Sequence, residues 1–121
     1  MKVYVDASPS EIACVPDEPF DWSDHNRNCI HPIPYYEILV GNYTNNEAEY
    51  IAVIRALEKF SPEVAEILSD SQLVVNQLNL KWSTKEDRLR NYGNQVHKLA
   101  QGKVKFTWIP REQNPAGRLL G

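Results

Sequence analysis

The chain has 121 residues, of which 42% are hydrophobic and 24% are charged, proportions that are typical of a globular protein. They exclude a disordered or fibrous chain, and no apolar run approaches the roughly 20 residues that a membrane-spanning helix needs. The N-terminus lacks the pattern of a secretory signal, and two cysteines cannot form a disulfide scaffold. We therefore expect a cytoplasmic protein with a single domain over residues 1–121.

The net charge of −3 conceals two halves of opposite sign. Residues 1–54 carry two cations and nine acids, a net charge of −7, whereas residues 71–121 carry nine cations and three acids, a net charge of +6. A basic half can follow a phosphate backbone by releasing its counterions. The same cations could instead only solvate helix and strand faces, so charge alone does not decide between the two interpretations.

The first part of the chain predicts three strands and a long loop. β-branched and aromatic residues predict strands over residues 2–7, ending near Asp6, and over Glu11–Val15 and Tyr35–Val40. Four prolines among several Asp and Asn residues interrupt this pattern over residues 16–34. Proline cannot continue a strand ladder, so we expect a loop insertion there.

Residues Asn45–Phe60 predict a helix, and the acids in its first turns suit the positive end of the helix dipole. At about 100° per residue, Glu49 lies within roughly 80° of the apolar positions that follow it, whereas Glu47 lies on the opposite side. We expect Glu49 to head the buried stripe and Glu47 to face solvent. A carboxylate on an apolar stripe needs a partner or a metal ion.

The second part of the chain predicts two strands and two helices. A strand is expected over Val64–Leu68 and a short helix over Ser71–Leu78. A further strand with one basic face is expected over Lys103–Trp108, with Trp108 in the core, and a short polar and then apolar tail follows over Pro110–Gly121. Between the short helix and this last strand, a helix that ends near Gly102 is indicated by apolar residues at spacings of 3, 4 and 3, namely Leu89, Tyr92, Val96 and Leu99.

Three acids should meet at one edge of this sheet. A strand, a helix and a second strand form a right-handed crossover, which makes the strands before Asp6 and Asp70 parallel. Ligands bind beyond the carboxyl ends of such strands, where the first turns of the crossover helix would bring Glu49. Carboxylate oxygens are the ligands that Mg²⁺ prefers, and two such ions can activate a water and stabilise a leaving oxygen at a phosphodiester. Each acid taken singly could instead be an ordinary cap or strand-end residue.

Four segments stand at the ends of the predicted elements: Val-Asp-Ala-Ser (5–8), Thr-Asn-Asn-Glu-Ala-Glu-Tyr (44–50), Asp-Ser-Gln (70–72) and Trp-Ile-Pro-Arg-Glu-Gln-Asn (108–114). In this order they resemble the ribonuclease H family, type 1, and the last segment is similar to its bacterial and archaeal branch. The resemblance covers nearly the whole chain apart from residues 16–34.

This resemblance implies an α/β fold with a mixed five-stranded sheet, three antiparallel strands followed by two parallel ones, flanked by helices. It implies a monomer that hydrolyses the RNA strand of RNA–DNA hybrids with Mg²⁺ or Mn²⁺. The family's catalytic and metal-binding acids fall on Asp6, Glu49 and Asp70. Its hybrid-binding positions fall on Asn45, Asn46 and Gln72, whose amides can both donate to and accept from a 2′-hydroxyl. The two asparagines could alternatively only cap the helix, and the glutamine could only be solvated.

The tail departs from the family pattern. The fourth acid of the family follows an Asn-x-x-Ala-Asp pattern, whereas residues 114–118 here read Asn-Pro-Ala-Gly-Arg, which puts Arg118 in the place of the acid. Asn114 could supply a neutral oxygen ligand in its stead; otherwise the second metal ion would bind weakly. The sequence therefore also allows a catalytically impaired nucleic-acid-binding protein on the same scaffold. A nuclease that acts on DNA or structured RNA is a third interpretation, since the same acids serve any phosphodiester.

A second metal site is a further, weaker hypothesis. Cys14, His25, Cys29 and His31 are residue types that bind Zn²⁺, but their spacing is irregular and contains no Cys-x-x-Cys pair. Solvated histidines with two small buried cysteines are the better interpretation.

Overall fold

The computed structural model describes residues 1–17 and 33–120. In chain order its elements are β1 (Lys2–Ser8), β2 (Glu11–Pro16), β3 (Tyr35–Ile38), α1 (Asn45–Phe60), β4 (Glu66–Ser69), α2 (Gln72–Leu78), α3 (Asp87–Ala100), β5 (Lys105–Trp108), the 3₁₀ turn η1 (Arg111–Gln113) and α4 (Pro115–Leu119). None of the helices in the described part of the chain is long and apolar enough to span a membrane.

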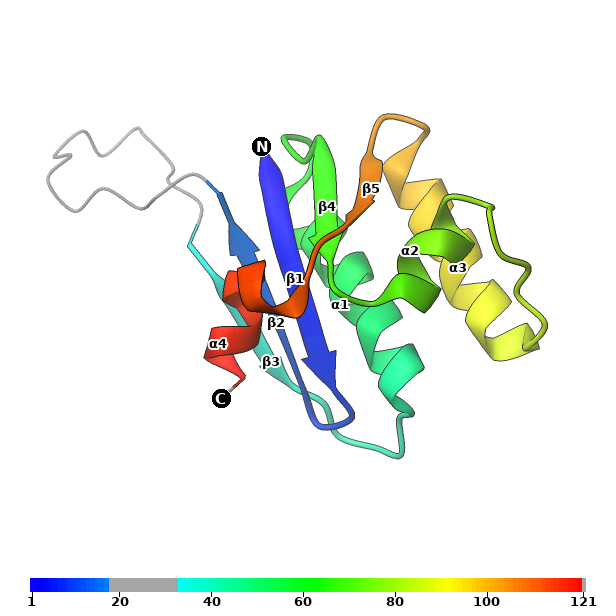
Figure 1. Cartoon of the computed structure of the whole chain (residues 1–121), viewed down its shortest axis with the longest axis horizontal. Helices are drawn as coiled ribbons and strands as arrows, with labels where there is room; N and C mark the ends of the chain where they lie inside the picture. The colour runs from blue at the N-terminus through cyan, green and yellow to red at the C-terminus, as the bar shows by residue number, and fades with distance from the viewer. Residues whose placement is uncertain (18–32, 121) are drawn as a thin grey trace, which may run out of the picture.

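The five strands form one mixed sheet in the order β3-β2-β1-β4-β5, which confirms the mixed five-stranded sheet that the family resemblance implied. The pairs β3–β2 and β2–β1 are antiparallel, and the pairs β1–β4 and β4–β5 are parallel. In Figure 1, α1 crosses behind the sheet, α3 lies beyond it on the side of β5, and the short α4 lies in front of β2. The N-terminal and C-terminal segments of the chain therefore meet at the same sheet.

The register of the parallel strands fixes where the acids lie. The ladder between β1 and β4 ends at the pair Val5–Ser69, so Asp6 and Asp70 are each the next residue beyond it. Strand β1 does not end near Asp6 as predicted, because its antiparallel pairing with β2 continues to Ser8. Asp6 is thus held rigidly on one side by β2 while its other side opens where β4 ends.

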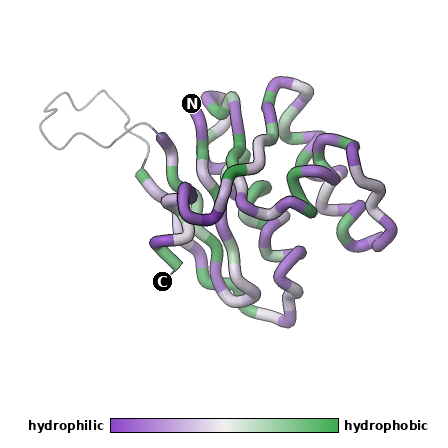
Figure 2. Tube along the Cα trace, in the orientation of Figure 1, coloured by the Kyte–Doolittle hydropathy of each residue, from purple (hydrophilic) through white to green (hydrophobic). Residues whose placement is uncertain are grey.

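The core lies between the sheet and α1. It is formed by inward-facing residues of β1 and β2 together with Ala, Val, Ile and Leu residues along α1, and it includes the fully buried Val3, Val5, Ile12 and Val53. Figure 2 shows hydrophobic stretches along the strands and α1, whereas hydrophilic residues dominate the loop between α2 and α3. Burial of this apolar area is the main favourable term that holds α1, and with it Glu49, against the sheet.

Several predicted positions were wrong in both halves of the chain. Trp108 is 42% exposed rather than in the core, because it is the last residue of the edge strand β5. Leu99 is 41% exposed, because Ala100 takes the next buried position after Val96 on α3. At the predicted loop, β2 extends to Pro16, and the main-chain N–H of Asp17 donates to the Lys2 carbonyl. The remainder of that predicted insertion, residues 18–32, lies outside the described residues.

Candidate active site

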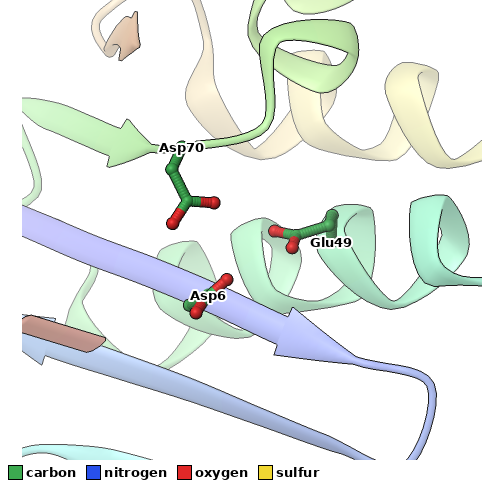
Figure 3. Close-up of side chains that lie close together, drawn as sticks. All are labelled: Asp6, Glu49 and Asp70. Atoms are coloured by element: carbon green, nitrogen blue, oxygen red, sulfur yellow. The ribbon is translucent and has the colours of Figure 1, made fainter. Parts of the chain in front are cut away.

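Three carboxylates from three separate segments meet beyond the end of the parallel ladder. One oxygen of each of Asp6 on β1, Glu49 on α1 and Asp70 after β4 lies within 4.8 Å of the others. Figure 3 shows the three side chains pointing toward a common space between β1, α1 and the end of β4. Asp6 and Glu49 are buried, and Asp70 is partly exposed.

Local sequence places Glu49 at this point. Thr44 caps α1 by accepting a hydrogen bond from the Glu47 N–H at 3.1 Å, and the Glu47 carboxylate accepts one from the Thr44 N–H at 3.2 Å. This capping box fixes the first turn of α1. Glu49 lies one turn after the cap, on the face of α1 that packs against β1. The start of α1 lies near the end of the β1–β4 ladder, so the Glu49 carboxylate lies close to Asp6.

The three carboxylates of Asp6, Glu49 and Asp70 repel one another, and a bound cation would relieve this repulsion. Burial, followed by the charges of Asp6 and Asp70, raises the pKa of Glu49 from 4.5 to about 9. The pKa of Asp6 is also raised, first by burial and then by the charge of Asp70. Like charges held this close disfavour ionisation of one another, so the group holds a proton unless a positive ion neutralises it.

A divalent metal ion fits these donors. The Glu49 Oε2 atom is buried and has no hydrogen-bond partner among the described residues. A buried carboxylate oxygen without a partner is costly, and a hard cation would satisfy it together with the oxygens of Asp6 and Asp70. The donor set contains only oxygens, which is the chemistry that Mg²⁺ and Mn²⁺ prefer.

The carboxylates open into a pocket of about 320 Å³. Asn45 lines this pocket as a predicted site residue, whereas Asn46 and Gln72, also predicted, lie at the starts of α1 and α2 and do not line it. Three residues from the tail, Arg111, Gly117 and Leu120, also line it. Burial raises the pKa of Asp6, and the charge of Arg111 offsets a small part of that rise.

The tail enters the site differently from either sequence expectation. The Asn114 Nδ2 atom donates to the Asp70 Oδ2 atom at 3.3 Å, while its Oδ1 atom accepts from the Ala116 N–H at 3.1 Å. The idea that Asn114 supplies an oxygen ligand was therefore wrong, because that oxygen caps α4. Arg118 is exposed and does not line the pocket, so the cation of the tail that faces the acids is Arg111.

Glu47 was predicted to face solvent and is instead 4% exposed. Its carboxylate accepts hydrogen bonds from Arg88 at 3.2 Å and from the Tyr92 hydroxyl at 3.4 Å, both on α3. Burial alone would raise the pKa of Glu47, but hydrogen bonds from Thr44 and Arg88 outweigh it and lower that pKa. The helical wheel failed here because α3 packs on the face of α1 that was assigned to solvent.

Of the residues in the zinc hypothesis, Cys14 is fully buried and its thiol donates to the Ala52 carbonyl at 3.4 Å. Burial raises the pKa of this thiol to about 12, which opposes the thiolate that zinc requires. His25, Cys29 and His31 lie outside the described residues.

Arg111 and Gly117 were not identified as site residues from the sequence. Arg111 lies in the Trp-Ile-Pro-Arg segment that resembles the family. Because three acids were expected at the site, a cation in a segment of the same family pattern could have been predicted to lie opposite them. Gly117 gave no such signal. A Cβ atom at this position would lie 3.0 Å from the Asp6 Oδ2 atom, a closeness that only the folded tail reveals.

Comparison with known proteins extends this description. Residues 35–120 match the family described as reverse transcriptase-like. Ribonuclease HI of Halobacterium salinarum is 39% identical over 80 residues, which are 62% of this chain and 40% of that protein. A bifunctional protein of Mycobacterium tuberculosis is 35% identical over 80 residues, 62% of this chain and 22% of that protein. The matched segment therefore spans well under two thirds of either relative.

Solved structures resemble the chain over nearly its whole length. The crystal structure of the RNase H1 of Halobacterium salinarum has a TM-score of 0.73 and 29% identity, covering 95% of this chain and 89% of that one. An RNase H1 in complex with an RNA/DNA hybrid has a TM-score of 0.70 and 26% identity, covering 99% of both chains. With the sheet order and the family match, these similarities show that the chain belongs to the reverse transcriptase-like family and, within it, to the type 1 ribonucleases H.

Proposed function

We propose that this chain is a metal-dependent endonuclease that hydrolyses the RNA strand of RNA–DNA hybrids, with Asp6, Glu49 and Asp70 as its catalytic and metal-binding residues. The observation that carries the proposal is the meeting of these three carboxylates within 4.8 Å, where one buried oxygen of Glu49 has no hydrogen-bond partner in residues 1–17 and 33–120. Family membership and the hybrid-bound relative support the choice of substrate. Location in a cytoplasm and action as a monomer stay predictions from the sequence.

Asp6, Glu49 and Asp70 would hold Mg²⁺ or Mn²⁺, and the proposed mechanism uses two such ions. When bound, the ions would activate a water for in-line attack on the scissile phosphate and stabilise the leaving oxygen. The protein's own part is to keep the carboxylates close together and to shield Asp6 and Glu49 from solvent. Arg111, on the pocket wall, provides a positive charge for the substrate phosphate.

Polar residues around the pocket supply the contacts to the hybrid. Asn45 lines the pocket directly, and Asn46 and Gln72 flank it at the N-termini of α1 and α2, where amides can reach a 2′-hydroxyl or a phosphate. A separate pocket of about 580 Å³ between α2 and α3 is lined by Trp82 and Arg90. Trp82 is 47% exposed, so its ring is accessible for stacking on a sugar or base.

One observation favours a second candidate, a hybrid-binding protein with impaired catalysis. The carboxylate group contains three acids in the described part of the chain, and the position of the family's fourth acid holds the exposed Arg118. With fewer anionic ligands a second metal ion binds less tightly. This candidate predicts binding of hybrids that does not depend on metal and is not followed by cleavage.

The two candidates separate in one assay. Labelled RNA–DNA hybrid, RNA duplex and DNA duplex are incubated side by side with Mg²⁺, Mn²⁺ or EDTA. Metal-dependent cuts inside the RNA strand of the hybrid support the enzyme, whereas EDTA-insensitive binding without cuts supports the binding protein. Cleavage of either duplex in preference to the hybrid would overturn the proposed substrate.

Asp70→Asn tests the residue assignment in the same assay. We expect it to abolish cleavage while the far-UV circular dichroism stays unchanged, because the amide keeps the shape and loses the charge. Asp87→Asn is the matched control, since that side chain is 89% exposed at the start of α3 and forms a surface ion pair with Arg90. Cleavage by the Asp70→Asn protein at the wild-type rate would refute the assignment.

A further inference from the structure

Asn114 connects three parts of the molecule through one side chain. It is 2% exposed, although it lies between the exposed Gln113 and the partly exposed Pro115. Its Nδ2 atom donates to the Val5 carbonyl on β1 at 2.9 Å and to the Asp70 Oδ2 atom at 3.3 Å. Its Oδ1 atom accepts from the Ala116 N–H, which caps α4.

The partners determine which way the amide points. The Val5 carbonyl and the Asp70 carboxylate are acceptors, so the atom that faces them must be the nitrogen. The Ala116 N–H is a donor, so the atom that faces it must be the oxygen. Reversing the amide would break all three hydrogen bonds at a buried position, and the observed orientation is therefore strongly preferred.

The Asp70 carboxylate has little else to orient it. Within residues 1–17 and 33–120, no other side chain donates a hydrogen bond to its oxygens. Its main chain is better held, because the Trp108 indole donates to the Asp70 carbonyl at 3.1 Å and the Ile109 N–H donates to the Ser69 carbonyl at 3.0 Å. Residues 108–114 thus fix the backbone of Asp70 through Trp108 and its carboxylate through Asn114.

We infer that Asn114 is a positioning residue, whose amide holds the Asp70 carboxylate toward Asp6 and Glu49 and so sets the affinity of the site for a divalent metal ion. This inference rests on the proposed function. The same amide nitrogen also donates to the Val5 carbonyl on β1, next to Asp6. Asn114 therefore holds the Asp70 carboxylate in a fixed position relative to the strand that carries Asp6. A fixed distance between those two carboxylates is what a shared cation requires.

The test is Asn114→Ser, with Gln113→Ser as the matched control. Serine keeps an oxygen that can cap α4 but is too short to donate to Asp70. The control changes the exposed neighbour in the same turn. Mn²⁺ affinity is measured by calorimetry, and hybrid cleavage is measured at saturating metal, both at a temperature where each variant is folded by circular dichroism.

For Asn114→Ser we expect Mn²⁺ affinity to fall by roughly tenfold or more and kcat to fall with it, the usual consequence of removing a residue that orients a metal ligand. The KM for the hybrid should change by less than about twofold, because Asn114 is 2% exposed and its side chain is not accessible to a substrate. A folded Asn114→Ser protein with wild-type Mn²⁺ affinity and kcat would overturn the inference and leave Asn114 with a purely structural role.

The wild-type protein gives a second measurement that does not depend on folding of the variant. In ¹⁵N spectra without metal, the Asn114 side-chain amide should exchange slowly with water and should shift on addition of Mg²⁺, and the exposed Asn94 amide serves as reference. A signal that exchanges as fast as that of Asn94 and ignores Mg²⁺ would overturn the inference. If the wild type binds Mn²⁺ but cleaves no hybrid, the proposed function fails while the affinity comparison still tests Asn114.

Discussion

Replacing the Glu49 carboxyl with an amide is expected to stabilise the metal-free protein above neutral pH. The pKa of Glu49 rises from 4.5 to about 9 on folding, so the folded state holds a proton that the unfolded chain has released. Stability from this group is therefore complete below pH 4.5 and is lost progressively as the pH rises toward 9. Glu49→Gln keeps the shape of the side chain and removes the titration.

The size of the effect follows from the shift. From the ordinary pKa of 4.5 to pH 8 is 3.5 units, and at about 1.4 kcal/mol per unit the upper limit is about 5 kcal/mol. Entry of water and small movements of Asp6 and Asp70 reduce this cost, and we expect about 2 kcal/mol. In a domain of this size that free energy corresponds to roughly 8 °C in the melting temperature.

The assay is urea unfolding in EDTA at pH 5.5, 7 and 8. The free energy of unfolding of the wild type should fall by about 1.4 kcal/mol across this range, because it covers 2.5 of the 3.5 units between pH 4.5 and 8, and that of Glu49→Gln should fall by less than half as much. Glu63→Gln, which changes an exposed acid in the turn after α1, is the matched control and should keep the wild-type slope. Equal slopes for Glu49→Gln and the wild type would refute the reasoning, as would a wild-type protein that becomes more stable with pH.

Two further substitutions test other parts of the site. Glu47→Gln should lower the free energy of unfolding by about 1–2 kcal/mol at pH 7, because it weakens the contact with Arg88. In the wild type this contribution is present above about pH 4.5 and is lost as the pH falls through the lowered pKa of Glu47. An equal difference in stability between variant and wild type at pH 3 and at pH 7 would argue against this reasoning. Gly117→Ala should weaken Mn²⁺ binding by roughly tenfold while leaving stability unchanged or higher, since the new Cβ atom meets the Asp6 carboxylate at 3.0 Å within a helix that favours alanine. Gly93→Ala is its control, because a Cβ atom there lies 3.9 Å from Tyr50 and far from the acids, and calorimetry that finds equal Mn²⁺ affinity for both alanine variants would count against a role for Gly117.

Periodicity and local rules predicted the elements well where the signal was local. The helix over Asn45–Phe60 was predicted correctly because its cap and the spacing of its apolar residues can both be recognised within one short segment of the sequence. The crossover rule, which needs only the sequence of element types, correctly predicted that β1 and β4 run parallel. The same rule brought Asp6, Glu49 and Asp70 to one edge, and their meeting is the part of the candidate site that sequence alone anticipated.

The tertiary structure decided what depends on a second element packing against the first. Glu47 is buried because α3 covers it, and Trp108 is exposed because β5 is the edge of the sheet. The periodicity of one helix or strand carries no record of which neighbour lies against each face. The tail is the sharpest case: Arg111, Asn114 and Gly117 reach the acids through a turn and a short helix whose docking depends on contacts with β1, more than a hundred residues away in the chain. The sequence by itself therefore determined which acids meet, and only the folded tail decided which side chains orient and surround them.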